Sequence, residues 1–193
     1  MKNILCSFVL GLLILNIYSC SPVNILASGG ATTMAVAESD RSIGEVVDDA
    51  TIKINIAAKF INSSDNLFVN INTTVLEGRV LLTGIVDSQE IRIDAVRRVW
   101  EVGGVNEVVN EVQIGDRASL KEYANDVWIN TQAKAVAAKT LGLRSVGYNF
   151  ETIHGKIYIA GITKKPKQLE ELISAIKTIK GVKEIVNYVI VKK

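Results

Sequence analysis

Few side chains in this sequence are suited to bond-making chemistry. It contains two cysteines, Cys6 and Cys20, and a single histidine, His154. A metal centre or a nucleophilic site needs several such groups that meet in the fold. One histidine without nearby thiols offers neither, and no set of residues combines a nucleophile, a general base and a general acid. We therefore expect no catalytic residues, no metal ligands, no cofactor and no enzymatic activity.

Cys20 is the residue most suited to covalent modification. It ends the segment Ile17-Tyr18-Ser19-Cys20, after an almost wholly apolar run from 4 to 17. That run is short for a membrane-spanning helix and is typical of a signal peptide. The segment resembles the bacterial lipobox, in which the signal is cleaved before a cysteine that is then lipidated. We expect a signal peptide over 1–19 and a lipid anchor, including palmitate, at Cys20.

The region after the cysteine is expected to be a flexible tether. Residues 20–42 contain many small residues and show no sustained periodicity, which favours a flexible chain. An Asp directly after the lipidated cysteine would resemble an inner-membrane retention signal, but this sequence has Ser21 there. We therefore expect the protein to be anchored at the periplasmic face of the outer membrane. Two alternatives stay open: cleavage at Ala35-Val36-Ala37, giving a secreted protein, and an uncleaved anchor.

The rest of the sequence is a duplication. Gly78, Gly84 and Gly104 recur 77 residues later as Gly155, Gly161 and Gly181. The same offset relates a longer set of pairs: Asp49 and Asp126, Ile52 and Ile129, Val105 and Val182, Glu107 and Glu184, Asn110 and Asn187. A period this long, seen twice, indicates two tandem domains. We expect the glycines at turns and helix ends, and Gly84 and Gly161 where a helix approaches the sheet.

Each copy has the pattern helix, strand, strand, helix, strand. We assign the first domain to 43–114, a linker to 115–119 and the second domain to 120–193. Apolar residues at helical spacing predict the helices, and alternating apolar residues predict the strands. The expected fold class is α+β, with two tandem αββαβ domains, each a three-stranded mixed sheet packed against two helices.

Local signals predict where these elements begin. The expected helix caps are Asp48 or Asp49, Asn125 or Asp126, and the capping box Asp87-x-x-Glu90. The alternation of Leu67, Val69, Ile71 and Thr73 predicts that the first strand begins at 67.

The doubled motif resembles the BON domain. It reads Gly78…Gly84…Gly104-Val105-x-Glu107-Val108-x-Asn110 in the first copy. BON domains occur singly or in tandem in bacterial envelope proteins. Together with the lipobox, the resemblance implies a non-enzymatic outer-membrane lipoprotein that binds anionic phospholipid and supports envelope integrity. It also implies that lipid contact lies mainly on the first helix of the second domain.

Trp128 lies on that helix and breaks the repeat, because its counterpart in the first copy is Thr51. An exposed indole suits a membrane interface, since it is apolar with one polar N–H group. Helical spacing places small and basic residues on or near the same face. The predicted phospholipid-binding residues are Trp128, Lys121, Ala124, Thr131, Gln132, Ala135 and Lys139. The expected partner is an anionic, phosphatidylglycerol-like membrane.

The sequence also allows alternatives to lipid contact. Trp128 could instead pack between the two domains, and we expect Trp100, the counterpart of Lys177, to pack there or locally. The whole protein could be a periplasmic scaffold for outer-membrane assembly, stress-response or cell-division proteins, without direct lipid binding. The net charge of +2 gives no reason to expect a nucleic-acid partner.

Overall fold

The computed structural model describes residues 40–63, 65–115 and 119–193. The predicted signal peptide, the anchor at Cys20 and almost all of the tether lie outside these residues. Both repeats belong to one compact unit of the chain. The first repeat consists of α4 (Ile43–Ile61), α5 (Leu67–Asn70), β1 (Ile71–Leu76), β2 (Arg79–Val86), α6 (Gln89–Trp100) and β3 (Glu107–Ile114).

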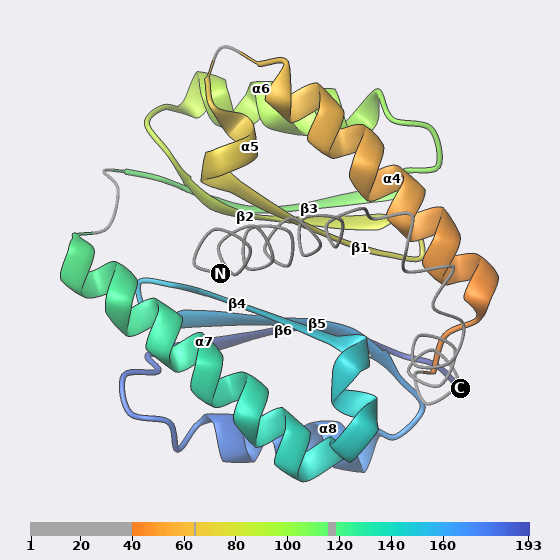
Figure 1. Cartoon of the computed structure of the whole chain (residues 1–193), viewed down its shortest axis with the longest axis vertical. Helices are drawn as coiled ribbons and strands as arrows, with labels where there is room; N and C mark the ends of the chain where they lie inside the picture. The colour runs from red at the N-terminus through yellow and green to blue at the C-terminus, as the bar shows by residue number, and fades with distance from the viewer. Residues whose placement is uncertain (1–39, 64, 116–118) are drawn as a thin grey trace, which may run out of the picture. The chain divides into compact units, whose positions relative to one another are not determined.

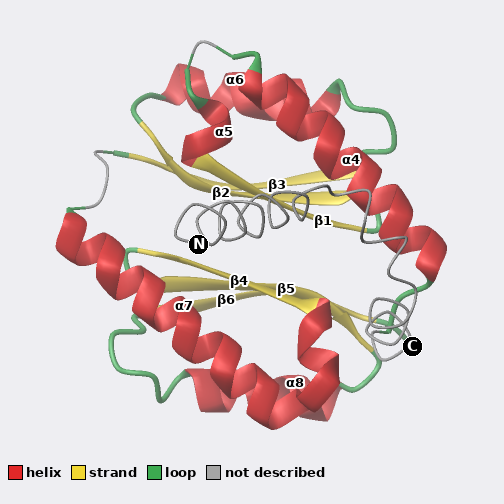
Figure 2. Ribbon diagram, viewed as in Figure 1, coloured by secondary structure: helices red, strands yellow, loops and turns green. Residues whose placement is uncertain are grey.

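The second repeat has the same plan. It consists of α7 (Leu120–Leu141), the 3₁₀ helix η1 (Gly142–Gly147), β4 (Tyr148–Ile153), β5 (Lys156–Thr163), α8 (Pro166–Ile176) and β6 (Glu184–Val191). In each sheet the middle strand pairs antiparallel with the strand before it and parallel with the last strand. Helices α4 and α6 cover one face of the first sheet, and α7 and α8 cover one face of the second (Figures 1 and 2). The predicted α+β fold is therefore confirmed.

Apolar side chains between the helices and the sheet form a core in each repeat. Ile52, Ile56 and Phe60 of α4 are buried against Val80 and Leu82 of β2. In the second repeat, Ile157 and Ile159 of β5 are buried against the inward-facing residues of α7 and α8, which are Ile129, Ala133, Ala137, Leu169, Leu172 and Ile176. Their spacing of three and four residues places them on one side of each helix.

The first helix of each repeat begins earlier than its predicted cap. Ser42 caps α4 and Ser119 caps α7, each in a capping box with the glutamate three residues later. Asp49 lies inside α4 and is 5% exposed. Its carboxylate accepts hydrogen bonds from the backbone N–H groups of Glu77 at 2.8 Å and Gly78 at 2.9 Å. The predicted cap at Asp48 or Asp49 is wrong, because this acid holds a distant hairpin turn.

Asp126 repeats this arrangement in α7. Its carboxylate accepts from the backbone N–H groups of His154 at 2.7 Å and Gly155 at 2.8 Å. The turn residues have positive φ angles, 52° at His154 and 80° at Gly155, and glycine tolerates such angles best. The prediction of Asn125 or Asp126 as a cap is therefore also wrong, whereas the predicted turn at His154-Gly155 is correct.

Two other boundaries differ from the sequence prediction. Residues 67–70 form the short helix α5, so the first strand begins at Ile71. Leu67 is fully buried while Val69 is 74% exposed, whereas two residues of one strand at this spacing would share a face. Ser88, rather than Asp87, caps α6, and its hydroxyl accepts from the N–H of Ile91 at 3.4 Å.

Gly84 and Gly161 permit a close approach, but not of a long covering helix. A Cβ added to Gly84 would lie 2.1 Å from the carbonyl oxygen of Asn70. At Gly161 it would lie 2.9 Å from the carbonyl oxygen of Gly147. Both carbonyls belong to the residue directly before the neighbouring strand. These glycines therefore let the short helical turn before β1 or β4 reach the sheet.

The sheet faces that carry no helices contact each other. Leu76 and Leu81 of the first repeat are buried in one cluster with Ala160 and Ile162 of the second. The hydroxyl of Tyr188 donates a hydrogen bond to the carboxylate of Glu111 beside this cluster. Burial and this carboxylate raise the pKa of Tyr188 to about 12. The two repeats are thus joined by an apolar contact with polar groups beside it.

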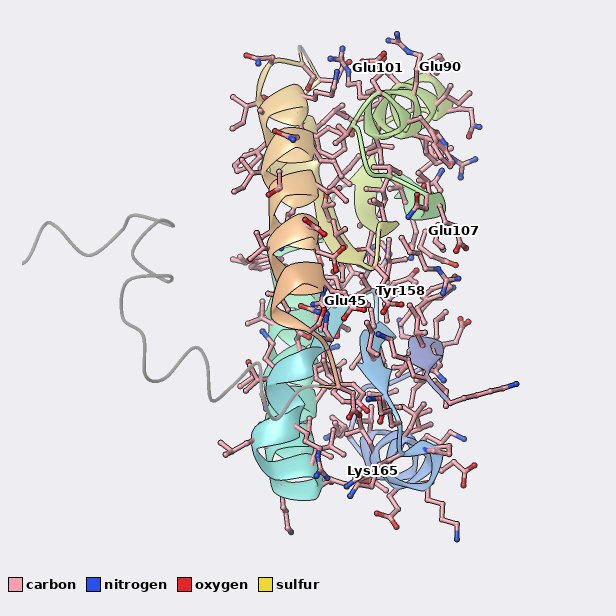
Figure 3. The ribbon with its side chains drawn as sticks, turned by 90° about the vertical axis from the view of Figure 1, so that its right-hand side faces the viewer. Glu45, Glu90, Glu101, Glu107, Tyr158 and Lys165 are labelled. Atoms are coloured by element: carbon pink, nitrogen blue, oxygen red, sulfur yellow. The ribbon has the colours of Figure 1, made fainter. Side chains whose placement is uncertain are left out.

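Lys192, the residue directly after β6, forms ion pairs between the repeats. The ammonium group of Lys192 contacts the carboxylate of Glu45 at 3.0 Å and also that of Glu77. Figure 3 shows Glu45 in the first turn of α4 and Tyr158 on β5. The hydroxyl of Tyr158 accepts from the amide of Gln113 at 3.3 Å. These contacts link the beginning of α4 and the end of β3 to the second repeat.

Candidate functional site

Helix α7 has one buried side and one long exposed side. Asp126, Ile129, Ala133, Ala137 and Leu141 are its buried residues. Since an α-helix turns once every 3.6 residues, positions about half a turn from these point away from the sheet. Those positions carry the residues that the sequence predicted to contact lipid.

The structure brings the predicted residues together on this outward side. Six of the seven are exposed, and Gln132 is partly buried. The six are Lys121, Ala124, Trp128, Thr131, Ala135 and Lys139. The hydroxyl of Thr131 donates to the carbonyl oxygen of Val127 at 2.8 Å, so its proton is used within the helix. We call these seven residues the outward face of α7.

Trp128 is the largest apolar side chain of the outward face and is 45% exposed. Thr51, its counterpart on α4, is exposed as well. The repeat therefore uses this position as a surface position in both copies, and only the second copy places an indole there. A half-exposed indole presents apolar area together with an N–H donor.

The charges on the outward face are positive. Lys121 lies in the first turn of α7 and Lys139 in its last turn. The nearby Glu122 is held at the end of the helix, where its carboxylate accepts from the backbone N–H of Ser119 at 2.9 Å. Hydrogen bonds from the side chain and backbone of Ser119 lower the pKa of Glu122. The outward face thus combines one indole with a basic residue near each end.

Sequence reasoning missed three exposed apolar residues on the flank of α7. Leu120 is 85% exposed, Tyr123 62% and Val127 47%. They lie beside the outward face, at positions i, i+3 and i+7. This spacing was visible in the sequence and could have identified them. They widen the apolar surface around the first half of α7.

The remaining predicted positions lie elsewhere. Trp100 is the last residue of α6 and is 52% exposed. His154 lies in the β4–β5 turn, where its backbone N–H donates a hydrogen bond to the carboxylate of Asp126. Among the residues that the structure describes, no three His, Cys, Asp or Glu side chains are grouped so as to hold a metal ion.

Comparison with known proteins identifies the repeated unit. The BON domain matches residues 48–116 and again 125–193. The chain belongs to the BON-domain family. Helix α7 is therefore the first helix of the second BON domain, and Asp49 and Asp126 occupy equivalent positions in the two BON domains.

Several relatives match across most of the chain. A protein of Anaplasma centrale from the gshII 5' region is 41% identical over 147 residues, covering 76% of this chain and 96% of its own. The outer membrane lipoprotein DolP of Haemophilus influenzae is 26% identical over 165 residues, covering 85% of each. The osmotically-inducible protein Y of Escherichia coli K12 is 26% identical over 154 residues, covering 79% of this chain and 77% of its own.

In the described ranges of the chain, no helix is both long enough and apolar enough to cross a bilayer.

Proposed function

We propose that this protein is a non-enzymatic lipoprotein of the bacterial envelope that docks on anionic phospholipid through its second BON domain. In this proposal Cys20 carries the lipid anchor at the periplasmic face of the outer membrane, and docking supports envelope integrity. The observation that carries the proposal is the exposed Trp128 with Lys121 and Lys139 on one side of α7. The similarity to a relative named as an outer membrane lipoprotein supports the location.

The physical basis is that of an interfacial helix. The indole of Trp128 enters the headgroup region, where its ring is apolar enough to leave water and its N–H still finds acceptors. Each lysine near an anionic surface contributes about 1 kcal/mol. The outward face is small, and its alanines insert little apolar volume. Docking by this face alone is therefore weak, and the anchor strengthens it by raising the effective concentration near the bilayer.

Co-sedimentation with vesicles tests this proposal. The protein used is residues 36–193, the compact unit that holds both domains, so that binding reports docking without the anchor. We expect binding to vesicles containing phosphatidylglycerol and little binding to phosphatidylcholine alone. Trp128→Ala removes the indole and Lys139→Glu reverses a charge, and each should weaken binding by about tenfold.

The matched control is Lys177→Glu, which makes the same charge change at an exposed site at the end of α8. It should leave vesicle binding nearly unchanged. If Lys177→Glu weakens binding as much as Lys139→Glu, net charge rather than the outward face determines binding. If the wild type does not bind anionic vesicles, a periplasmic scaffold that binds envelope-assembly proteins becomes the better account.

A further inference from the structure

A groove of about 650 Å³ lies along the flank of α7 that faces the first BON domain. Its lining comes from α7 and β4 of the second domain and from α5, β1 and β2 of the first. Val69, Leu120, Tyr123 and Val127 give it apolar walls. Its volume is within the range of pockets that hold small ligands. Trp128 is not among the lining residues, so this groove is separate from the outward face.

Two polar groups at this groove have no hydrogen-bond partner in the part of the chain that the structure describes. The hydroxyl of Thr152 and the Oδ1 atom of Asn130 are buried and have no hydrogen-bond partner among the described residues. Thr152 as a whole is only 7% exposed, and both residues line the groove. A buried polar group without a partner costs about 1–3 kcal/mol, and folded proteins contain few of them. Two such atoms in one groove indicate that a bound molecule forms hydrogen bonds with them.

The repeat shows that the fold does not require these polar groups. The counterpart of Thr152 is Val75, which is buried in the apolar core of the first domain. The counterpart of Asn130 is Lys53, which is exposed. Valine and threonine have nearly the same shape, so the first domain fills this position without a hydroxyl. The two polar groups, like Trp128, are therefore features that distinguish the second domain from the first.

The charged side chains among the described residues that line the groove are both acidic, Asp126 and Glu151. The other polar lining groups are amides and hydroxyls, those of Asn70, Asn72, Asn130, Tyr123 and Thr152. Both Asp126 oxygens already accept backbone hydrogen bonds. Burial raises the pKa of Glu151, while a hydrogen bond with Asn72 opposes this rise. A positively charged donor placed here would gain hydrogen bonds and attraction to the carboxyl groups, whereas an anion would meet like charge.

We propose that this groove binds a small amphipathic primary amine. Its ammonium group donates hydrogen bonds to Asn130 and Thr152, and its alkyl part lies between Val69, Leu120 and Tyr123. An ammonium group has three donors and no acceptor, which matches oxygens that need donors. The apolar walls match a short alkyl chain. This inference does not depend on the lipid contact proposed for the outward face.

Titration of the full chain with hexylamine, in a non-ionic detergent, tests the proposal. Binding is followed by the backbone amide signals of the ¹⁵N-labelled protein. We expect shifts that saturate and that map to both walls, at Val69 and Val127. Hexanoate should not bind, and 1-hexanol should bind more weakly by about tenfold or more, because a neutral hydroxyl offers one donor and no charge.

Thr152→Val is the decisive variant, because it places the first domain's residue in the second. It should weaken hexylamine binding by about tenfold or more, the value of one hydrogen bond to a charged group. It should keep or raise the melting temperature, since an unpaired hydroxyl is removed. Asn130→Leu should weaken binding similarly. The control Thr51→Val removes an exposed hydroxyl from the first domain and should leave binding unchanged.

Three results would overturn the proposal. They are no saturable shifts at the groove, equal affinity for hexylamine and 1-hexanol, and unchanged hexylamine affinity in a folded Thr152→Val protein. Trp128→Ala and Lys139→Glu should leave hexylamine binding unchanged. The amine site and the membrane-docking face can therefore succeed or fail separately.

Discussion

At the scale of single residues, two equivalent aspartates explain why the hairpin turn has the same position in both domains. Asp49 and Asp126 each lie inside a helix and accept two backbone N–H groups from a turn 28 and 29 residues further along. Without the carboxylate, these donors would lack their protein partner in a mostly buried place. The side chain thus fixes the helix against the hairpin in both domains.

Asp126→Ala is therefore predicted to lower the free energy of unfolding by about 2–4 kcal/mol, because hydrogen bonds to a charged group are lost and donors are left unsatisfied. Urea unfolding followed by circular dichroism measures the change. The neighbouring Asn125 is exposed, and Asn125→Ala should change stability by less than about 0.5 kcal/mol. Equal effects of the two substitutions would contradict this role of Asp126.

The sequence predicted some of these residue roles and not others. Gly78 and Gly155 were placed correctly at turns, with φ angles of 74° and 80°, because turn chemistry is local. The role of Asp126 could not be inferred locally, since an acid near the start of a helix usually caps it and its real partners are distant in sequence. Thr152 was missed for the same reason, because its groove needs elements from both domains.

At the scale of elements, the first helices are longer at their amino-terminal ends than the apolar pattern predicted. The capping boxes at Ser42 and Ser119 start them about two and a half turns before the first buried apolar residues, Ile52 and Ile129. Residues 67–70, which form α5, were predicted as strand because so short a run does not distinguish the apolar spacing of a strand from that of a helical turn. Asn66, with a φ of 52°, lets the chain enter that turn. Helical spacing alone, however, selected seven positions of α7 of which six are exposed.

The capping box of α4 gives a prediction about pH. The backbone and side chain of Ser42, together with Lys192, lower the pKa of Glu45 from an ordinary 4.5 to about 2. A carboxyl group whose pKa is lower in the folded state stabilises the fold above its ordinary pKa and stops doing so as pH falls through the lowered value. The difference in unfolding free energy between wild type and Glu45→Gln should therefore be largest near pH 7 and shrink from about pH 4.5 towards pH 2. A difference that stays constant over this range would contradict it.

At the scale of the whole molecule, the contact between the two sheets makes the BON domains a joint unit. Leu81 points into the cluster between the sheets, whereas its neighbour Leu82 points into the first domain's own core. Successive residues of a strand face opposite ways. Substitution of Leu81 therefore tests the contact between the domains, and substitution of Leu82 tests the stability of the first domain itself. Each domain alone is small for an independent core, which gives the contact its importance.

Calorimetry can distinguish the two roles. The wild type should unfold in one cooperative transition. Leu82→Ala should move this transition to lower temperature, since it removes about 2–5 kcal/mol of core packing. Leu81→Asn should instead separate the transition into two, because a polar group in the cluster disfavours the contact between sheets. A single transition in Leu81→Asn would show that this cluster does not couple the domains.

The central claim, that Trp128 enters the membrane interface, is tested most directly by its fluorescence. The chain has two tryptophans, and both are about half exposed in water. Trp100→Phe leaves Trp128 as the only reporter, and Trp128→Phe leaves Trp100 as its matched control. With vesicles of phosphatidylglycerol and brominated phosphatidylcholine, Trp128 should shift to shorter wavelength and be quenched, while Trp100 should change little. Unchanged Trp128 emission, or equal quenching of both tryptophans, would contradict docking through the outward face of α7.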